Sequence, residues 1–169
     1  MGRRMVGFAS SAVFLLALSD AAVSDVRSFR IPNRASVTLL AAFVVFALAS
    51  GVGMDVALRH GAACVLVFIA GAALFALGIW GGGDVKLLAA ASLWTGFAGL
   101  PRLLAVMSVA GGLLAVSVLL LRRLPAANEG WLTLWQRRVT ASGHVPYGVA
   151  IAAGGLDWWL KAGLRGVGL

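Results

Sequence analysis

Long apolar stretches separated by polar segments run through most of this chain. Six of them have the length and composition of membrane helices, at about residues 5–24, 36–54, 61–80, 85–99, 103–121 and 145–160. A helix needs roughly 20 apolar residues to cross the hydrocarbon core of a bilayer, and short connections place successive helices antiparallel. The pattern therefore predicts an all-α, polytopic membrane protein built as a bundle of six transmembrane helices.

The composition agrees with this prediction. Of the 169 residues, 61% are hydrophobic and 12% are charged, which excludes a soluble globular domain and indicates one membrane-embedded domain over residues 1–169. The formal net charge is +8, but the basic residues occur in small groups between the apolar stretches. Such groups are typical of loops beside anionic lipid, so we expect membrane lipid as a partner and no nucleic acid.

Two segments leave alternatives open. The first apolar stretch follows Arg3 and Arg4, as in a signal peptide, although its apolar part is short and Asp20 lies where a cleavage site needs small neutral residues. The segment 122–144 is polar and carries Trp131 and Trp135 at helical spacing. We interpret it as a short amphipathic helix in the membrane interface, with substrate contact as an alternative role.

The strongest interruption of the apolar pattern is Gly81-Gly82-Gly83-Asp84. Successive glycines destabilise a helix interior by roughly 1 kcal/mol each, so they predict a break between two helices, with Asp84 at the start of the second. Unpaired N–H groups at a helix N-terminus favour an ionised carboxylate. An acid at the membrane edge is a candidate functional group, and a plain helix N-cap is the alternative.

A second acid, Asp25, closes the first apolar stretch. Because two complete crossings separate it from Asp84, both acids are expected at the same membrane face. The adjoining loop carries Arg27, Arg30 and Arg34, which indicates the cytoplasmic side. Asp20 is the competing candidate; it lies five residues before Asp25 and therefore on another face of the same helix.

Two neighbouring carboxyl groups that share a proton can activate a water molecule, as in aspartic proteases. From its place at a helix N-terminus, Asp84 is expected to be the base toward water. Asp25, at the C-terminus of its own helix, is expected to be the proton donor, although the pair titrates as a unit. Cys64, His60 and His144 lie apart without metal-ligand spacing, so we expect no disulfide, metal or cofactor.

Three short motifs, in this order, resemble those of the prepilin peptidases, which are GxGD-type membrane aspartic proteases. The small size of the chain is most similar to the Flp or Tad pilus branch. The motifs are Asp25 with Ile31-Pro32-Asn33, then Gly81-Gly82-Gly83-Asp84-Val85-Lys86, then Pro146-Tyr147-Gly148.

This resemblance implies removal of the N-terminal leader of a prepilin or pseudopilin, after a glycine, at the cytoplasmic face of the bacterial inner membrane. It makes Asp25 and Asp84 the catalytic pair, with water as the nucleophile. The resemblance also implies a slim backbone at Gly81 and Gly83. The supporting positions it implies are Lys86, Pro32, Asn33, Pro146, Tyr147 and Gly148.

The chain departs from the larger, bifunctional members of that family, which carry paired cysteines and methylate the new pilin terminus. We therefore expect neither zinc nor methyltransferase activity. Two functions of other classes stay open. One is a small ion-coupled transporter or channel component with an ion at Asp25, Asp84 and Lys86. The other is a structural subunit of a secretion platform. The sequence does not indicate an oligomeric state.

Overall fold

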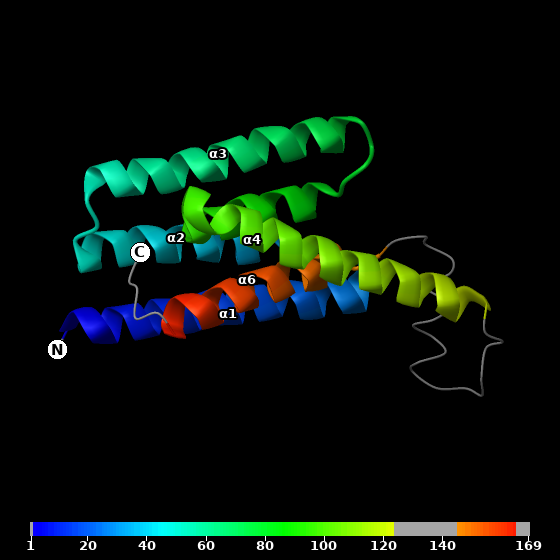
Figure 1. Ribbon diagram of the computed structural model, residues 1–169, viewed down its shortest axis with the longest axis horizontal. Coiled ribbons are helices and arrows are strands. Elements are labelled where there is room, and N and C mark those ends of the chain that lie inside the picture. The colour runs from blue at the N-terminus through cyan, green and yellow to red at the C-terminus, as the bar shows by residue number, and fades with distance from the viewer. Residues whose placement is uncertain (1, 124–144, 165–169) are drawn as a thin grey trace.

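A computed structural model describes residues 2–123 and 145–164 of the chain, and over these residues it contains helices and no strand (Figure 1). This confirms the predicted all-α class. The segment predicted to form an interfacial helix lies, from residue 124 onward, outside the described residues. The helices are α1 (Gly2–Ser28), α2 (Asn33–Ser50), α3 (Met54–Ala76), α4 (Gly82–Arg123) and α6 (Tyr147–Leu164).

Four of the described helices are long and apolar enough to cross a membrane: Ala9–Ser28 of α1, then α2, α3 and α4. Helix α6 is not among these four. The chain is thus a membrane protein by the length and composition of its helices. The count of six spans stays a prediction.

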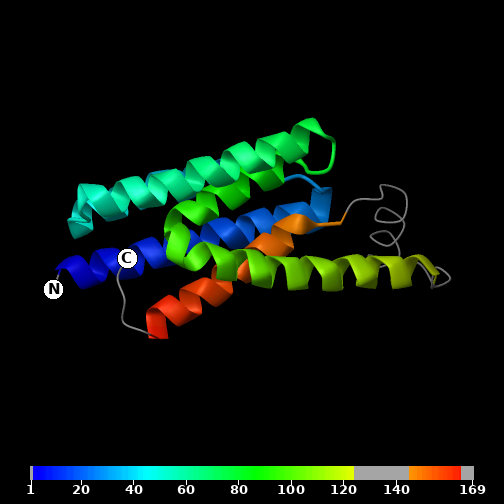
Figure 2. The ribbon, with the colours of Figure 1, turned by 45° about the horizontal axis from the view of Figure 1, so that its top comes forward.

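Helix α4 consists of two arms that fold back on each other at Gly96 (Figures 1 and 2). Gly96 has φ 57° and ψ −174°, a combination that only glycine adopts readily. The first arm, 82–95, is about 20 Å long at 1.5 Å per residue, which is shorter than the hydrocarbon core. Nearly every residue from Val85 to Gly96 is buried. The stretch predicted as a span at 85–99 is therefore a short central helix followed by a sharp turn.

The sharp turn between α1 and α2 follows from its sequence. Pro32 precedes the first residue of α2 and has an extended backbone. It also disfavours helical geometry at Ile31, so the chain cannot run as one helix through this turn. Helix α1 continues to Ser28, past the predicted end at residue 24, so Asp25 lies in its last turn. The Ser24 hydroxyl donates to the carbonyl oxygen of Arg30 at 2.9 Å, which holds the turn back against α1.

The core is centred on the buried first arm of α4, which packs among α1, α2 and α3, and α6 completes it by packing against α1 and the second arm of α4. Close packing there needs small residues: a methyl group at Gly154 would lie 2.7 Å from the carbonyl oxygen of Leu103. Beside it, aromatic rings form a cluster. The ring centroid of Trp94 lies 5.1 Å from that of Phe14 and 5.7 Å from that of Phe43. Trp94 also donates to the carbonyl oxygen of Leu39 on α2, at 3.0 Å. These contacts join α1, α2, α4 and α6 into one bundle.

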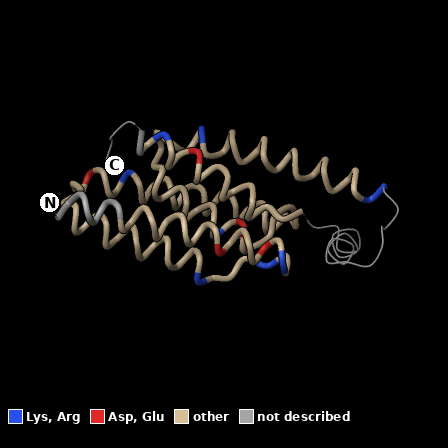
Figure 3. Tube along the Cα trace, turned by 90° about the horizontal axis from the view of Figure 1, so that it is seen from below, with Lys and Arg blue, Asp and Glu red and all other residues tan. Residues whose placement is uncertain are grey.

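Charged residues are sparse along the helices and gather mostly near their ends (Figure 3). Two acids join neighbouring helices through paired hydrogen bonds to arginine: Asp20 of α1 to Arg34 of α2, and Asp157 of α6 to Arg102 of α4. A planar guanidinium suits such two-fold contact with a carboxylate. Asp20, the competitor of Asp25 in the sequence, is thus engaged with Arg34.

Candidate active site

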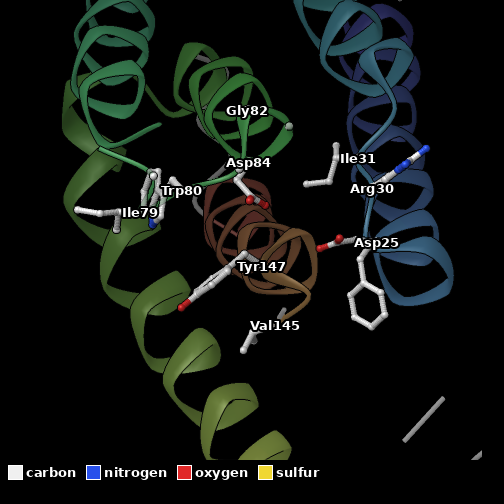
Figure 4. Close-up of a pocket in the computed structure, with 13 residues that line it drawn as sticks. Asp25, Arg30, Ile31, Ile79, Trp80, Gly82, Asp84, Val145 and Tyr147 are labelled. Atoms are coloured by element: carbon white, nitrogen blue, oxygen red, sulfur yellow. The ribbon is translucent and has the colours of Figure 1, made fainter. Parts of the chain in front are cut away.

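The two acids singled out in the sequence line the same cavity, which has a volume of about 590 Å³ (Figure 4). Asp25 comes from the last turn of α1, and Asp84 comes from the first turn of α4. Figure 4 shows their carboxyl groups turned toward the same space, in front of the first turn of α6. Two segments separated by 59 positions in the sequence therefore form one acidic site.

Asp25 is held by the backbone of a third helix. Its side chain is buried, with the residue only 6% exposed, and its Oδ2 accepts a hydrogen bond of 2.7 Å from the N–H of Gly148. Gly148 lies in the first turn of α6. The predicted asymmetry between the two acids considered only the helix that carries each one. In the structure Asp25 also faces a helix N-terminus, so that argument for making Asp25 the proton donor does not hold.

Two of the three glycines before Asp84, Gly81 and Gly83, are closely approached by neighbouring side chains. A methyl group at Gly81 would lie 2.7 Å from Asp84 Oδ2, and one at Gly83 would lie 3.0 Å from Cβ of Ile31. The N–H of Val85 donates to the carbonyl oxygen of Gly81 at 3.2 Å, which starts α4. The absence of side chains at Gly81 and Gly83 therefore makes room for neighbouring protein groups, namely the Asp84 carboxylate and the Ile31 side chain.

Lys86 and Asn33 bond to each other and do not line this cavity. Lys86 Nζ donates to Asn33 Oδ1 at 3.0 Å, and both side chains are exposed. The bond joins the first turn of α4 to the first residue of α2. Two motifs that are 53 positions apart in the sequence are therefore linked directly, just outside the cavity.

The remaining predicted residues separate into two groups. Tyr147 lines the cavity, whereas the two prolines do not. Pro146 is fully buried, and Pro32 lies immediately before α2. No group of three His, Cys, Asp or Glu side chains suited to a metal ion is found within residues 2–123 and 145–164. His60 instead packs beneath Gly96, with Nδ1 2.8 Å from the carbonyl oxygen of Leu93.

Several cavity residues were missed by sequence reasoning. Phe29 has φ 52°, unusual for a residue with a side chain, and its N–H donates to the carbonyl oxygen of Asp25 at 2.8 Å. The arginine-rich loop was used only as a topology signal, although its position next to Asp25 points to the site. The missed lining residues are Phe29, Arg30, Ile31, Gly78, Ile79, Trp80, Gly82 and Val145.

A protein-family model, described as the type IV leader peptidase family, matches residues 12–116. The chain belongs to this family. As a leader peptidase it acts on prepilin substrates, and the resemblance to the prepilin peptidase family is confirmed at the level of the family. The matched region contains both acids of the cavity, whereas Gly148 lies beyond it. Comparisons with curated proteins and with solved structures give no match.

Proposed function

We propose that this leader peptidase is an aspartic endopeptidase in which Asp25 and Asp84 together activate a water molecule. The observation that carries the proposal is their convergence on one cavity from two different helices (Figure 4). In this mechanism one carboxylate takes a proton from water, and the protonated partner donates to the scissile carbonyl oxygen. The tetrahedral intermediate then collapses, and a proton passes to the leaving amine.

We infer that the substrate is the N-terminal leader of a Flp or Tad type prepilin, cut after a glycine at the cytoplasmic face of the inner membrane. The cavity is suited to an extended peptide because its walls include the glycine-rich backbone 81–83. Arg30 on its rim, with Arg27 and Arg34 nearby, favours the cytoplasmic side by the positive-inside rule. We expect no methylation of the new pilin terminus.

The test is co-expression with a Flp-type prepilin, with leader removal followed by gel mobility and the new N-terminus identified by mass spectrometry. Asp25→Asn and Asp84→Asn are each expected to reduce cleavage by about a thousandfold or more, because removal of one member of a catalytic unit disables the whole unit. Mass spectrometry also reports whether the product is methylated.

Asp20→Asn is the matched control, since it changes an acid of the same helix that is bonded to Arg34 and does not line the cavity. It is expected to cleave at the wild-type rate. Normal leader removal in both Asp25→Asn and Asp84→Asn would contradict the aspartic mechanism. An unprocessed prepilin with the wild-type chain would contradict the choice of substrate.

A further inference from the structure

The first turn of α6 reaches a catalytic candidate that is 123 residues away in the sequence. The bond from Gly148 N–H to Asp25 Oδ2 is 2.7 Å long and buried, within the range of hydrogen bonds to a charged acceptor. A buried bond of this kind favours one orientation of a short side chain, because turning the Asp25 carboxylate away would remove the acceptor of the buried Gly148 N–H.

Position 148 has no space for a side chain. A methyl group there would lie 2.9 Å from Asp25 Oδ2, 3.1 Å from Asp25 Cβ and 3.1 Å from Ile31 Cδ1. Real Cβ atoms rarely approach other atoms so closely, so the Asp25 side chain would have to turn. A residue with a Cβ at position 148 would therefore displace the Asp25 side chain from the position in which it accepts this hydrogen bond.

The turn that carries Gly148 is itself held in place. Val149 N–H donates to the carbonyl oxygen of Pro146 at 3.2 Å, and Pro146 is fully buried. On the opposite side, a methyl group at Gly111 of α4 would lie 3.2 Å from Cε1 of Tyr147, which shows how closely α4 packs on this turn. The donor is thus part of a packed element and not of a loose loop.

We propose that Gly148 is a positioning residue for the peptidase reaction: its N–H orients the Asp25 carboxylate, and its missing side chain makes that contact possible. The inference rests on the proposed role of Asp25 in catalysis. It assigns to Pro146-Tyr147-Gly148 the placement of an acid, in addition to the start of α6. Gly148 does not act on the substrate itself.

The contact can be observed without any activity. The chain contains a single tyrosine, Tyr147, which immediately precedes Gly148. Labelling with ¹³C-carbonyl tyrosine and ¹⁵N-glycine therefore marks one peptide bond in the full-length protein, and its amide gives a single peak in a carbonyl-correlated NMR spectrum in detergent micelles. We expect a downfield amide proton that exchanges slowly with solvent.

Substitution of the acceptor decides whether this amide bonds to Asp25. In Asp25→Ala the downfield shift and the slow exchange are expected to be lost, whereas Asp20→Ala leaves both unchanged. An amide peak that stays the same in Asp25→Ala would overturn the proposal. This measurement gives the same answer whether or not the wild-type chain cleaves a prepilin, so it is independent of the proposed substrate.

The consequence for catalysis is tested by Gly148→Ala. We expect kcat to fall roughly 10- to 100-fold with KM changed by less than about twofold, because the carboxylate is misplaced while the substrate-binding walls remain. Gly112→Ala is the matched control, since a methyl group added at Gly112 of α4 would have no neighbouring atom within 4 Å, and it is expected to keep wild-type activity. A kcat for Gly148→Ala within about twofold of wild type would refute the positioning role. Should Gly148→Ala not fold, the amide measurement decides.

Discussion

The turn at Gly96 is a point where both the backbone conformation and the neighbouring side chains oppose a single added methyl group. Gly96 joins the two arms of α4 with φ 57° and ψ −174°. A methyl group there would lie 2.8 Å from both Cε1 and Nε2 of His60. The His60 ring cannot move easily, because its Nδ1 is 2.8 Å from the carbonyl oxygen of Leu93. The ring also stacks on Phe43, with 5.6 Å between the two ring centroids.

Two separate terms contribute to the effect of Gly96→Ala. The backbone conformation is essentially restricted to glycine, and holding another residue there raises the energy by about 1–3 kcal/mol. Overpacking against a fixed ring adds about 1–3 kcal/mol. We therefore expect a total destabilisation of roughly 2–6 kcal/mol, which corresponds to a melting temperature lowered by roughly 4–24 °C for a chain of this size.

A double-mutant cycle with His60→Ala separates the two terms. Thermal unfolding is measured in detergent micelles for Gly96→Ala, His60→Ala and the double variant. The double variant is expected to be more stable than the sum of the single effects predicts by about 1–3 kcal/mol, since the clash is removed and the backbone strain remains. Gly112→Ala serves as the control and is expected to be neutral or slightly stabilising, because it adds a methyl group to a helix in open space. A Gly96→Ala variant with the same melting temperature as the wild type would refute this reasoning.

Two further predictions concern polar links between helices. Asn33→Ala and Lys86→Met are each expected to lower stability by about 0.5–1.5 kcal/mol, and the double variant by no more than the larger single effect, because both break one bond; additive losses in the unfolding cycle would contradict this. Arg102→Met is expected to leave the melting temperature close to that of the wild type, since an exposed ion pair such as the one with Asp157 contributes little to stability, and to leave prepilin cleavage at the wild-type rate. Loss of cleavage in a folded Arg102→Met protein would show a role that the structure does not indicate.

Hydrophobic patterning predicted the helical class and the helix break near residue 81. It did not predict the sharp turn at Gly96, because an apolar stretch looks the same whether it faces lipid or lies buried in the bundle. The residues from Val85 to Gly96 are mostly apolar and, apart from the exposed Lys86, buried, because the helix is surrounded by protein. This helix is short because Gly96 ends it. The special dihedral angles of one glycine among 22 cannot be recognised from composition.

The candidate site was predicted from its acids, but not its supporting contacts. Counting crossings requires only that α2 and α3 each cross once, so it brings Asp25 and Asp84 to the same end without any knowledge of packing. The partners of the two acids depend on how helices dock. The bond from Gly148 to Asp25 and the bond from Lys86 to Asn33 each join residues more than 50 positions apart, and no local pattern in the sequence encodes them.

These contacts show how the fold sets the approach of the two acids. Asp25 is attached to α6 through Gly148, and the first turn of α4, which carries Asp84, is attached to α2 through Lys86. The segment that carries Asp84 meets the turn that follows Asp25 where Gly83 packs against Ile31. A methyl group added at Gly83 would lie 3.0 Å from Cβ of Ile31. A larger residue at 83 would push the wall carrying Asp84 away from the turn that follows Asp25. We therefore expect Gly83→Ala to increase the separation of the two acids and to slow prepilin cleavage, and a wild-type cleavage rate in this variant would contradict that expectation.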